Sequence, residues 1–215
     1  MNYWAFDLDG TLVDSFSHYF KILDVIFQDH GARFSPEHRH TALTQPIPDF
    51  FEKHLGKAAV EPAIEKLTKV STKDAEQIHP FDGITTAVEH LVSSGAKVAV
   101  WTNRDLISAE LILKHTKLKR LAEICISGTC VVQRKPSAEG LLKISSRFGC
   151  HARDITVVGD HEHDVQAAKS VGARAVRASW HSYWTVERCT QADAQFYTVP
   201  EFTAWVQSRK QSRLN

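Results

Sequence analysis

Residues 6–15 read Phe-Asp-Leu-Asp-Gly-Thr-Leu-Val-Asp-Ser, and they place the carboxylates of Asp7 and Asp9 between an apolar segment and a glycine. Tyr3 to Leu8 is expected to form a short buried strand, in which alternate side chains share a face. Asp7 and Asp9 should therefore leave the strand end pointing the same way. Two such carboxylates repel and raise one pKa above its usual value of roughly 4, unless a divalent cation or a division into acid and base resolves the repulsion.

Hydrophobic spacing divides the chain into two kinds of region. Between residues 15 and 79 it predicts helical pieces broken by prolines and glycines, with no strand pattern. Beyond them, strands expected near 97–101, 124–126, 155–158 and 174–176 alternate with helices, which indicates a parallel sheet covered on both faces. We expect an α/β fold with a Rossmann-like core, residues 1–14 and 80–215, and a small all-helical domain, residues 15–79, inserted after the first strand.

Three further polar motifs accompany the predicted strands. Thr102 and Asn103 directly follow the strand of residues 97–101, and Lys135 precedes a proline and a helix. Residues 159–164 read Gly-Asp-His-Glu-His-Asp and follow another strand. In parallel sheets ligands bind at the carboxyl ends of the strands. We therefore expect these motifs and the first two aspartates to meet at one edge of the sheet.

The DxDGT run of residues 7–11, followed in order by Thr102, Lys135 and the GDxxxD block of residues 159–164, resembles the haloacid dehalogenase-like (HAD) hydrolases. The inserted helical region is similar to the small cap of the phosphoglycolate phosphatase-like subfamily. The resemblance implies a phosphatase that hydrolyses a small phosphomonoester metabolite, such as phosphoglycolate or a sugar phosphate. It also implies an aspartyl-phosphate intermediate and a magnesium cofactor.

The resemblance implies a role for each motif residue. Asp7 would be the nucleophile, and Asp9 would act as general acid and then as general base. Thr102 and Lys135 would bind the transferring phosphoryl group and complete the catalytic set. The remaining phosphate contacts would come from Gly10, which permits a tight turn, and from Asn103.

Mg²⁺ would be held by oxygen atoms of four aspartates: Asp7, Asp9 through its main-chain carbonyl, Asp160 and Asp164. Hard oxygen ligands fit Mg²⁺ better than zinc. His161 and His163 stand within the same block, but on a helix they would project about 200° apart and could not ligate one ion. We therefore expect no histidine ligand.

Composition excludes several classes of partner. The 215 residues carry a formal net charge of +1, which indicates neither a nucleic-acid groove nor an anionic-membrane surface. No apolar run approaches the roughly 20 residues that span a bilayer, and the catalytic strand begins at once, so a cytoplasmic protein is expected. The four cysteines are irregularly spaced and should be reduced thiols. We expect a small phosphorylated metabolite as partner, and a monomer or homodimer.

The helical region is less informative about chemistry. Several of its basic side chains are candidates for contacts with an anionic substrate, and a solvated helix face is the alternative: His38, Arg39, His40, Lys53 and His54. Gln45 stands where phosphoglycolate phosphatase-like members have glycine. A phosphosugar mutase would keep every motif described above. A non-catalytic regulatory module would have lost at least one motif residue, and none is lost.

Overall fold

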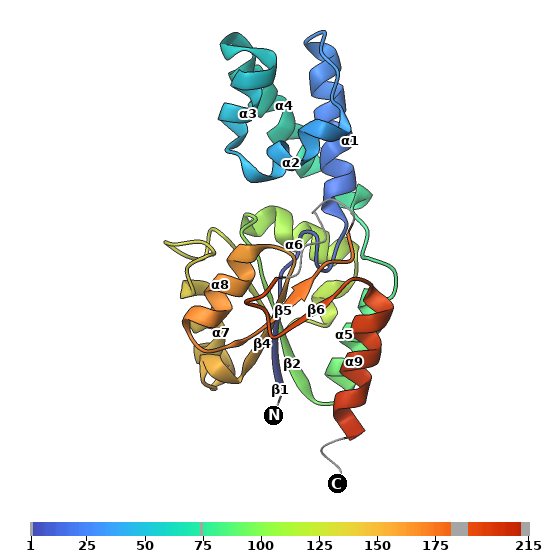
Figure 1. Cartoon of the computed structure of the whole chain (residues 1–215), viewed down its shortest axis with the longest axis vertical. Helices are drawn as coiled ribbons and strands as arrows, with labels where there is room; N and C mark the ends of the chain where they lie inside the picture. The colour runs from blue at the N-terminus through green and yellow to red at the C-terminus, as the bar shows by residue number, and fades with distance from the viewer. Residues whose placement is uncertain (1, 74, 182–188, 212–215) are drawn as a thin grey trace. The chain divides into compact units, whose positions relative to one another are not determined.

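The computed structural model describes residues 2–73, 75–181 and 189–211. The chain divides into two compact units (Figure 1), one comprising Met1–Asp14 and His79–Asn215, the other Ser15–Ile78. The first unit contains the sheet, and the described elements of the second are all helices joined by short connections. No helix in the described part of the chain has the length and apolarity that crossing a membrane requires.

The sheet has six parallel strands in the order β3-β2-β1-β4-β5-β6, which confirms the predicted fold class. Their bounds are Asn2–Phe6 (β1), Ala96–Trp101 (β2), Ile124–Ile126 (β3), Ile155–Gly159 (β4), Arg174–Ala178 (β5) and Ala194–Phe196 (β6). Phe6 is in register with Val100 of β2 and with Val158 of β4. The carboxyl ends of the three central strands are therefore level, so the residues that follow them share one edge.

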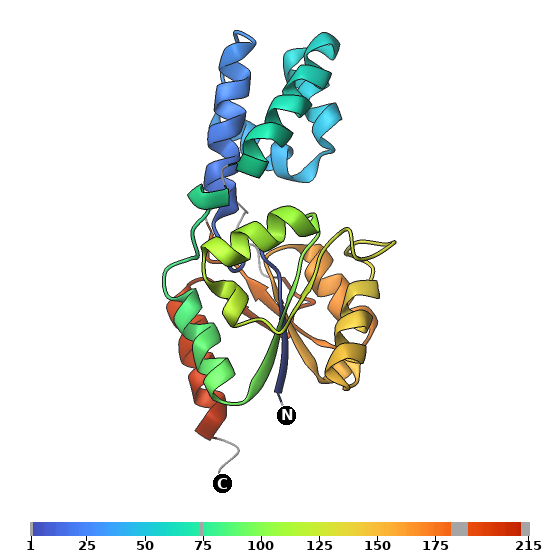
Figure 2. The same cartoon turned by 180° about the vertical axis from the view of Figure 1, so that it is seen from behind.

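Helices cover both faces of the sheet (Figures 1 and 2), with α5 and α9 on one side and α7 and α8 on the other. The bounds of the α-helices are Ile84–Ser93 (α5), Leu106–His115 (α6), Glu139–Phe148 (α7), Glu162–Ser170 (α8) and Val199–Gln211 (α9). Two short 3₁₀ segments complete the described helical parts of this unit, Leu118–Arg120 (η3) before β3 and Ala152–Asp154 (η4) before β4. Helix α8 begins three residues before the predicted start at Val165, because His161 caps it.

Strand β1 is buried by side chains on both of its faces. Trp4 and Phe6 pack edge-to-face against aromatic residues of α9, with ring centroids 6.0 Å apart for Trp4 and Trp205 and 6.1 Å apart for Phe6 and Phe202. Ala5 points to the other face, into the core cluster formed with α7 and α8. Packing on both sides holds β1 firmly, and with it the backbone that leads into Asp7.

The loop after β1 is a tight turn that ends beside the returning chain. Gly10 has a φ of 75°, a conformation that favours glycine, and the amides of Leu12 and Val13 both donate to the Leu8 carbonyl at 3.0 Å. Val13 then forms an antiparallel bridge with Pro80. The Asp14 amide donates to the carbonyl of His79 at 2.9 Å. The segments that leave and re-enter the sheet unit are therefore paired with each other.

The helical unit is held together by aromatic side chains. Its α-helices are Ser15–Asp29 (α1), Pro36–Thr44 (α2), Ile47–Leu55 (α3) and Val60–Lys73 (α4), with 3₁₀ segments Lys57–Ala59 (η1) and Ala75–Gln77 (η2). Phe27 lies 5.8 Å from Phe50 between ring centroids. The rings of His38 and His54 lie 4.6 Å apart, and the His54 ring lies 4.8 Å from that of Phe50. These two half-buried imidazoles thus pack against aromatic rings.

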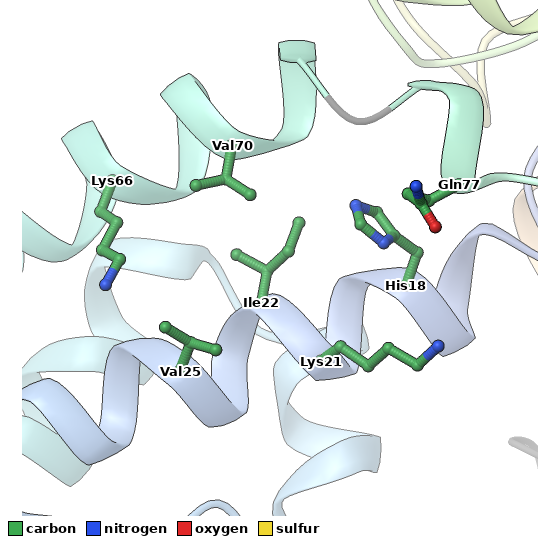
Figure 3. A pocket seen from close by; sticks show the side chains of 7 residues that line it. All are labelled: His18, Lys21, Ile22, Val25, Lys66, Val70 and Gln77. Atoms are coloured by element: carbon green, nitrogen blue, oxygen red, sulfur yellow. The ribbon is translucent and has the colours of Figure 1, made fainter.

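A pocket of about 280 Å³ lies between α1 and α4 of the helical unit (Figure 3). Ile22 and Val70 supply apolar walls, and His18 and Lys21 supply polar ones. Lys66, which also lines the pocket, forms an ion pair with Asp29. None of the sequence motifs contributes to this pocket.

Candidate active site

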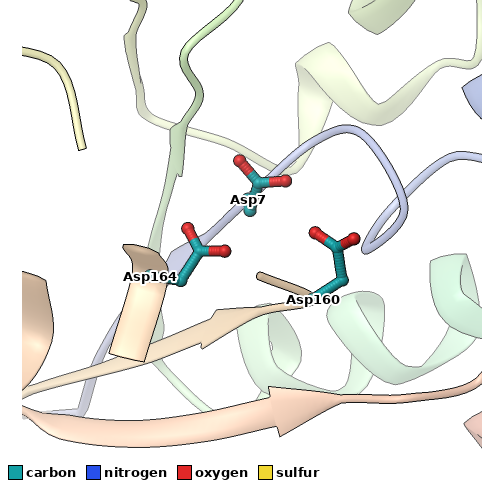
Figure 4. A group of neighbouring side chains, drawn as sticks. All are labelled: Asp7, Asp160 and Asp164. Carbon is teal, nitrogen blue, oxygen red and sulfur yellow. The ribbon is translucent and has the colours of Figure 1, made fainter. Parts of the chain in front are cut away.

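Three buried carboxylates meet at the carboxyl edge of the sheet (Figure 4). Asp7 follows β1, Asp160 follows β4, and Asp164 lies in the first turn of α8. One carboxylate oxygen from each lies within 4.8 Å of the others, and all three residues are buried. Residues more than 150 positions apart therefore form a single cluster, as the level strand ends require.

Lys135 inserts its ammonium group into this cluster. Its Nζ forms ion pairs with Asp7 and, at 2.6 Å, with Asp164, and it donates to the Trp101 carbonyl at 2.9 Å. Burial lowers the pKa of Lys135, but Asp164 and Asp7 outweigh burial and raise it overall, so the side chain stays charged. Burial, followed by repulsion from the neighbouring carboxylates, raises the pKa of Asp7 well above its usual value, although Lys135 opposes this.

The charge of this cluster fits a bound divalent cation. Three carboxylates face one ammonium group in a buried site, which leaves an excess of negative charge that is costly without a counter-ion. Carboxylate oxygens are also the ligands that Mg²⁺ prefers. The His181 side chain is buried, and its Nε2 lies 3.0 Å from Oδ2 of Asp160, where it orients that carboxylate.

Thr102 and Asn103 follow β2 beside the same cluster. Thr102 is buried, and its amide donates to the Ile126 carbonyl at 3.0 Å. The Asn103 side chain accepts from the Lys135 amide at 3.0 Å and donates to the Lys135 carbonyl at 3.2 Å. The Asn103 side chain thus fixes the backbone of Lys135. A phosphate contact by Asn103, as predicted from the sequence, would come from its main chain and stays a prediction.

The carboxylate of Asp9 lies outside the three-aspartate cluster and pairs with Arg104. Nη2 of Arg104 lies 2.7 Å from Oδ1 of Asp9, and Nε lies 3.0 Å from Oδ2. Arg104 is not among the residues predicted from the sequence, although its place two residues after Thr102 puts it at the same sheet edge. His181 was missed as well, because no motif leads to it.

Gly159 is required by the close approach of Asp164. A Cβ atom at position 159 would lie 2.4 Å or less from three side-chain atoms of Asp164. The Asp164 side chain also accepts from the His161 amide at 3.1 Å through Oδ2, while Oδ1 takes the bond from Lys135. The glycine of the GDxxxD block therefore serves to let Asp164 fold back over the end of β4.

The prediction that His161 and His163 project in opposite directions from a helix is wrong. Their ring centroids lie 4.3 Å apart, not on opposite sides of a helix. His161 is the N-cap residue of α8, with extended φ and ψ of −108° and 155°, and its Nδ1 accepts from the His163 amide at 3.2 Å. Within the described residues, the group of three or more side chains placed to hold a metal consists of the aspartates alone.

Comparison with known proteins gives a family match over most of the chain. A family model described as haloacid dehalogenase-like hydrolase matches residues 5–178. A phosphoglycolate phosphatase of Xanthomonas campestris pv. campestris (strain 8004) is 29% identical over 182 residues, which cover 81% of this chain and 81% of that protein. The matched span includes every motif described above.

Solved structures share the fold over nearly the whole chain. A predicted phosphoglycolate phosphatase from Haemophilus somnus superposes with a TM-score of 0.82, at 20% identity, and covers 96% of this chain and 98% of its own. A putative β-phosphoglucomutase from Thermotoga maritima superposes with a TM-score of 0.81, also at 20% identity, and covers 97% and 99%. At this identity the likeness concerns the fold alone.

Proposed function

The chain belongs to the haloacid dehalogenase-like hydrolases, and from that premise we propose that it is a Mg²⁺-dependent phosphatase of a small phosphomonoester metabolite. One observation carries the proposal. Asp7, Lys135 and the pair Asp160 and Asp164 come from three separate segments and meet in one buried cluster at the carboxyl edge of the sheet. Similarity to a phosphoglycolate phosphatase supports a phosphomonoester as substrate.

In the proposed reaction Asp7 attacks first. An oxygen of its carboxylate forms a bond to phosphorus while the phosphorus–oxygen bond of the ester breaks, which gives an aspartyl-phosphate and an alcohol. Asp9, protonated on one carboxylate oxygen before this step, donates that proton to the departing alkoxide oxygen. Water then attacks the phosphorus of the aspartyl-phosphate, Asp9 accepts its proton, and inorganic phosphate leaves as the Asp7 carboxylate is restored.

Lys135 and Thr102 support this reaction by binding and charge. The Lys135 ammonium lies against Asp7 and offsets negative charge where an anionic ester approaches a carboxylate. Thr102 lies at the end of β2 and would hold an oxygen of the transferring phosphoryl group. Asn103 keeps Lys135 in place through its two main-chain hydrogen bonds.

The metal would be held by Asp7, Asp160 and Asp164, with the main-chain carbonyl of Asp9 as a further ligand. A divalent cation bound there would neutralise charge on the phosphoryl oxygens that the nucleophile approaches. The residues of the chain fix its place: Asp160 is oriented by His181, and Asp164 by the His161 amide. Asp164 also holds Lys135, so it links the metal site to the phosphate site.

The helical unit is proposed to act as a cap that selects the substrate, with residues 1–14 and 80–215 as the catalytic core and residues 15–79 as the cap. Every motif residue lies outside the cap in sequence. A cap that varies while the core is kept would let one chemistry serve many substrates. Phosphoglycolate is the first substrate to test, and sugar phosphates are the second.

Phosphate release from a panel of phosphorylated acids, sugars and nucleotides tests this function directly. We expect Mg²⁺-dependent release from a small phosphomonoester, with Asp7→Asn as the inactive matched control. Release from no member of the panel would contradict the proposal. Transfer of the phosphoryl group to a second hydroxyl of a sugar phosphate, without release, would instead establish a mutase.

A further inference from the structure

Arg104 binds the carboxylate of Asp9 with two nitrogens. Nη2 lies 2.7 Å from Oδ1, and Nε lies 3.0 Å from Oδ2 and 3.2 Å from Oδ1. Both oxygens of Asp9 therefore accept from one guanidinium group. The planar fork of arginine matches a carboxylate in this way, so the pair fixes the direction of the carboxylate as well as its charge.

Arg104 is itself held in place, through its main-chain amide by Thr102 and through its guanidinium by Ser108 at the start of α6. The Arg104 amide donates to Oγ1 of Thr102 at 3.1 Å, and Nη1 donates to Oγ of Ser108 at 3.3 Å. Asp105 caps the helix by accepting from the Ser108 amide at 2.9 Å and from the Ser108 hydroxyl at 2.8 Å. The residue that holds Asp9 is thus tied to Thr102, which is proposed to bind the transferring phosphoryl group.

Asp9 needs such support because it lies in a loop. Strand β1 ends at Phe6, so Asp9 sits in the turn that Gly10 makes possible, beyond the part of the chain that the sheet holds. A general acid must come within about 2.6–3.2 Å of the atom it protonates. A misplacement of about 1 Å can cost about 10²-fold in rate.

We propose that Arg104 is a positioning residue that holds the Asp9 carboxylate in one orientation at the catalytic edge and acts on the reaction through Asp9. The inference rests on the proposed function, in which Asp9 handles both protons; in the acid step one oxygen of Asp9 carries the proton while the other keeps its contact with Arg104. The side chains of Arg104 and Asp9 are each 21% exposed, so the pair is shielded enough for a fixed geometry but remains open to substrate. Lysine could supply the charge at this position but not the fork.

A double-mutant cycle tests whether Arg104 acts through Asp9. In the parent protein, Arg104→Ala should lower kcat by about 10²-fold, because Asp9 loses its orientation. In the Asp9→Asn background the same substitution should change kcat by no more than about twofold, since its target is already removed. Arg104→Lys should fall between the parent and Arg104→Ala, because it keeps the charge without the two-pronged contact.

Leaving-group dependence provides a second measurement that a structural role would not alter. Asp9 protonates the departing oxygen, and an alkoxide needs that proton far more than a nitrophenolate does. Arg104→Ala should therefore reduce kcat/KM more for an alkyl phosphate than for p-nitrophenyl phosphate. A variant that had merely lost folded protein would show equal losses on both.

The control is Arg120→Ala, which removes an exposed ion pair with Glu89 in the same unit and should stay within about twofold of the parent. An equal loss from Arg104→Ala with and without the Asp9 carboxylate would overturn the inference while leaving the proposed function standing. An unchanged rate in Asp9→Asn would overturn it too, together with the role of Asp9. A parent protein without phosphatase activity would overturn the proposed function and this inference with it.

Discussion

The two units of the chain bury different kinds of side chain. Among residues whose burial the structure describes, the buried charged groups all belong to the sheet unit: Asp7, Lys135, Asp160 and Asp164. The helical unit buries phenylalanines instead, among them Phe27, Phe50 and Phe51. Burying a charged group costs free energy and is tolerated where the group is paired with an opposite charge. Aromatic packing stabilises a folded unit without placing reactive groups in it. The difference supports the proposal that the chemistry belongs to the sheet unit.

Replacement of Asp7 is the strongest test of this division. Asp7→Asn should lower kcat by at least about 10³-fold, because the amide keeps the shape of the carboxylate but is a poor nucleophile. Its melting temperature should stay close to that of the parent. The matched control is Asp154→Asn, which changes an exposed aspartate just before β4. Activity of folded Asp7→Asn within tenfold of the parent would contradict the nucleophile assignment.

Removal of the metal should have the next largest effect. EDTA should abolish turnover and Mg²⁺ should restore it, while Asp160→Ala should raise the Mg²⁺ concentration for half-maximal rate by about tenfold or more. Calorimetric titration with Mg²⁺ alone measures the same weakening without substrate. Restoration by Zn²⁺ but not Mg²⁺ would instead make the adjacent rings of His161 and His163 candidates for ligands.

A substitution in the helical unit should alter recognition and leave the chemistry intact. Arg39 is exposed, with its guanidinium 5.4 Å from the Phe20 ring centroid. Arg39→Ala should raise KM for the preferred substrate by about two- to fivefold, the size of one exposed ionic contact, and spare p-nitrophenyl phosphate. Arg33→Ala, another exposed arginine of the unit, is the control. Equal loss of kcat on every substrate would remove the distinction between the units.

The smallest effect concerns the pH dependence of the helical unit. Burial, then the nearby His38 and Lys53, lower the pKa of His54 below its usual 6.5. Below pH 6.5 the unfolded chain therefore binds more protons at this residue than the folded chain does, and stability falls as the pH falls. His54→Phe keeps the aromatic packing and removes the titration. Its melting temperature should drop less than that of the parent between pH 7.5 and 5.5, and equal drops would contradict the prediction.

The sequence predicts the sheet better than it predicts the detailed contacts of the site. Residue types at strand ends identify Asp7 and Asp160, because parallel strands must end at a common edge, and the GDxxxD spacing adds Asp164. The pairing of Arg104 with Asp9 joins residues 95 positions apart through side-chain direction. Spacing along the chain carries no information about that direction, so the pair is visible only in three dimensions.

The start of α8 shows a second limit of prediction. Helical periodicity places helix residues well but gives the first turn poorly, because capping depends on one residue's backbone conformation. His161 adopts an extended conformation before Glu162, and this brings its ring to His163. His181 could not be predicted for a different reason: it contacts Asp160 but belongs to none of the sequence motifs.

The pairing of Val13 with Pro80 has a consequence for how this protein can change over evolution. The two segments that connect the helical unit to the sheet unit are paired with each other at Val13 and Pro80. An insertion of any length would therefore join the sheet unit through the same two neighbouring segments. The entropy of closing such an insertion grows slowly, by about 0.6 kcal/mol for each doubling of its length. A longer, shorter or unrelated segment with adjacent ends can therefore be grafted between Asp14 and His79 while β1 and its aspartates keep their places.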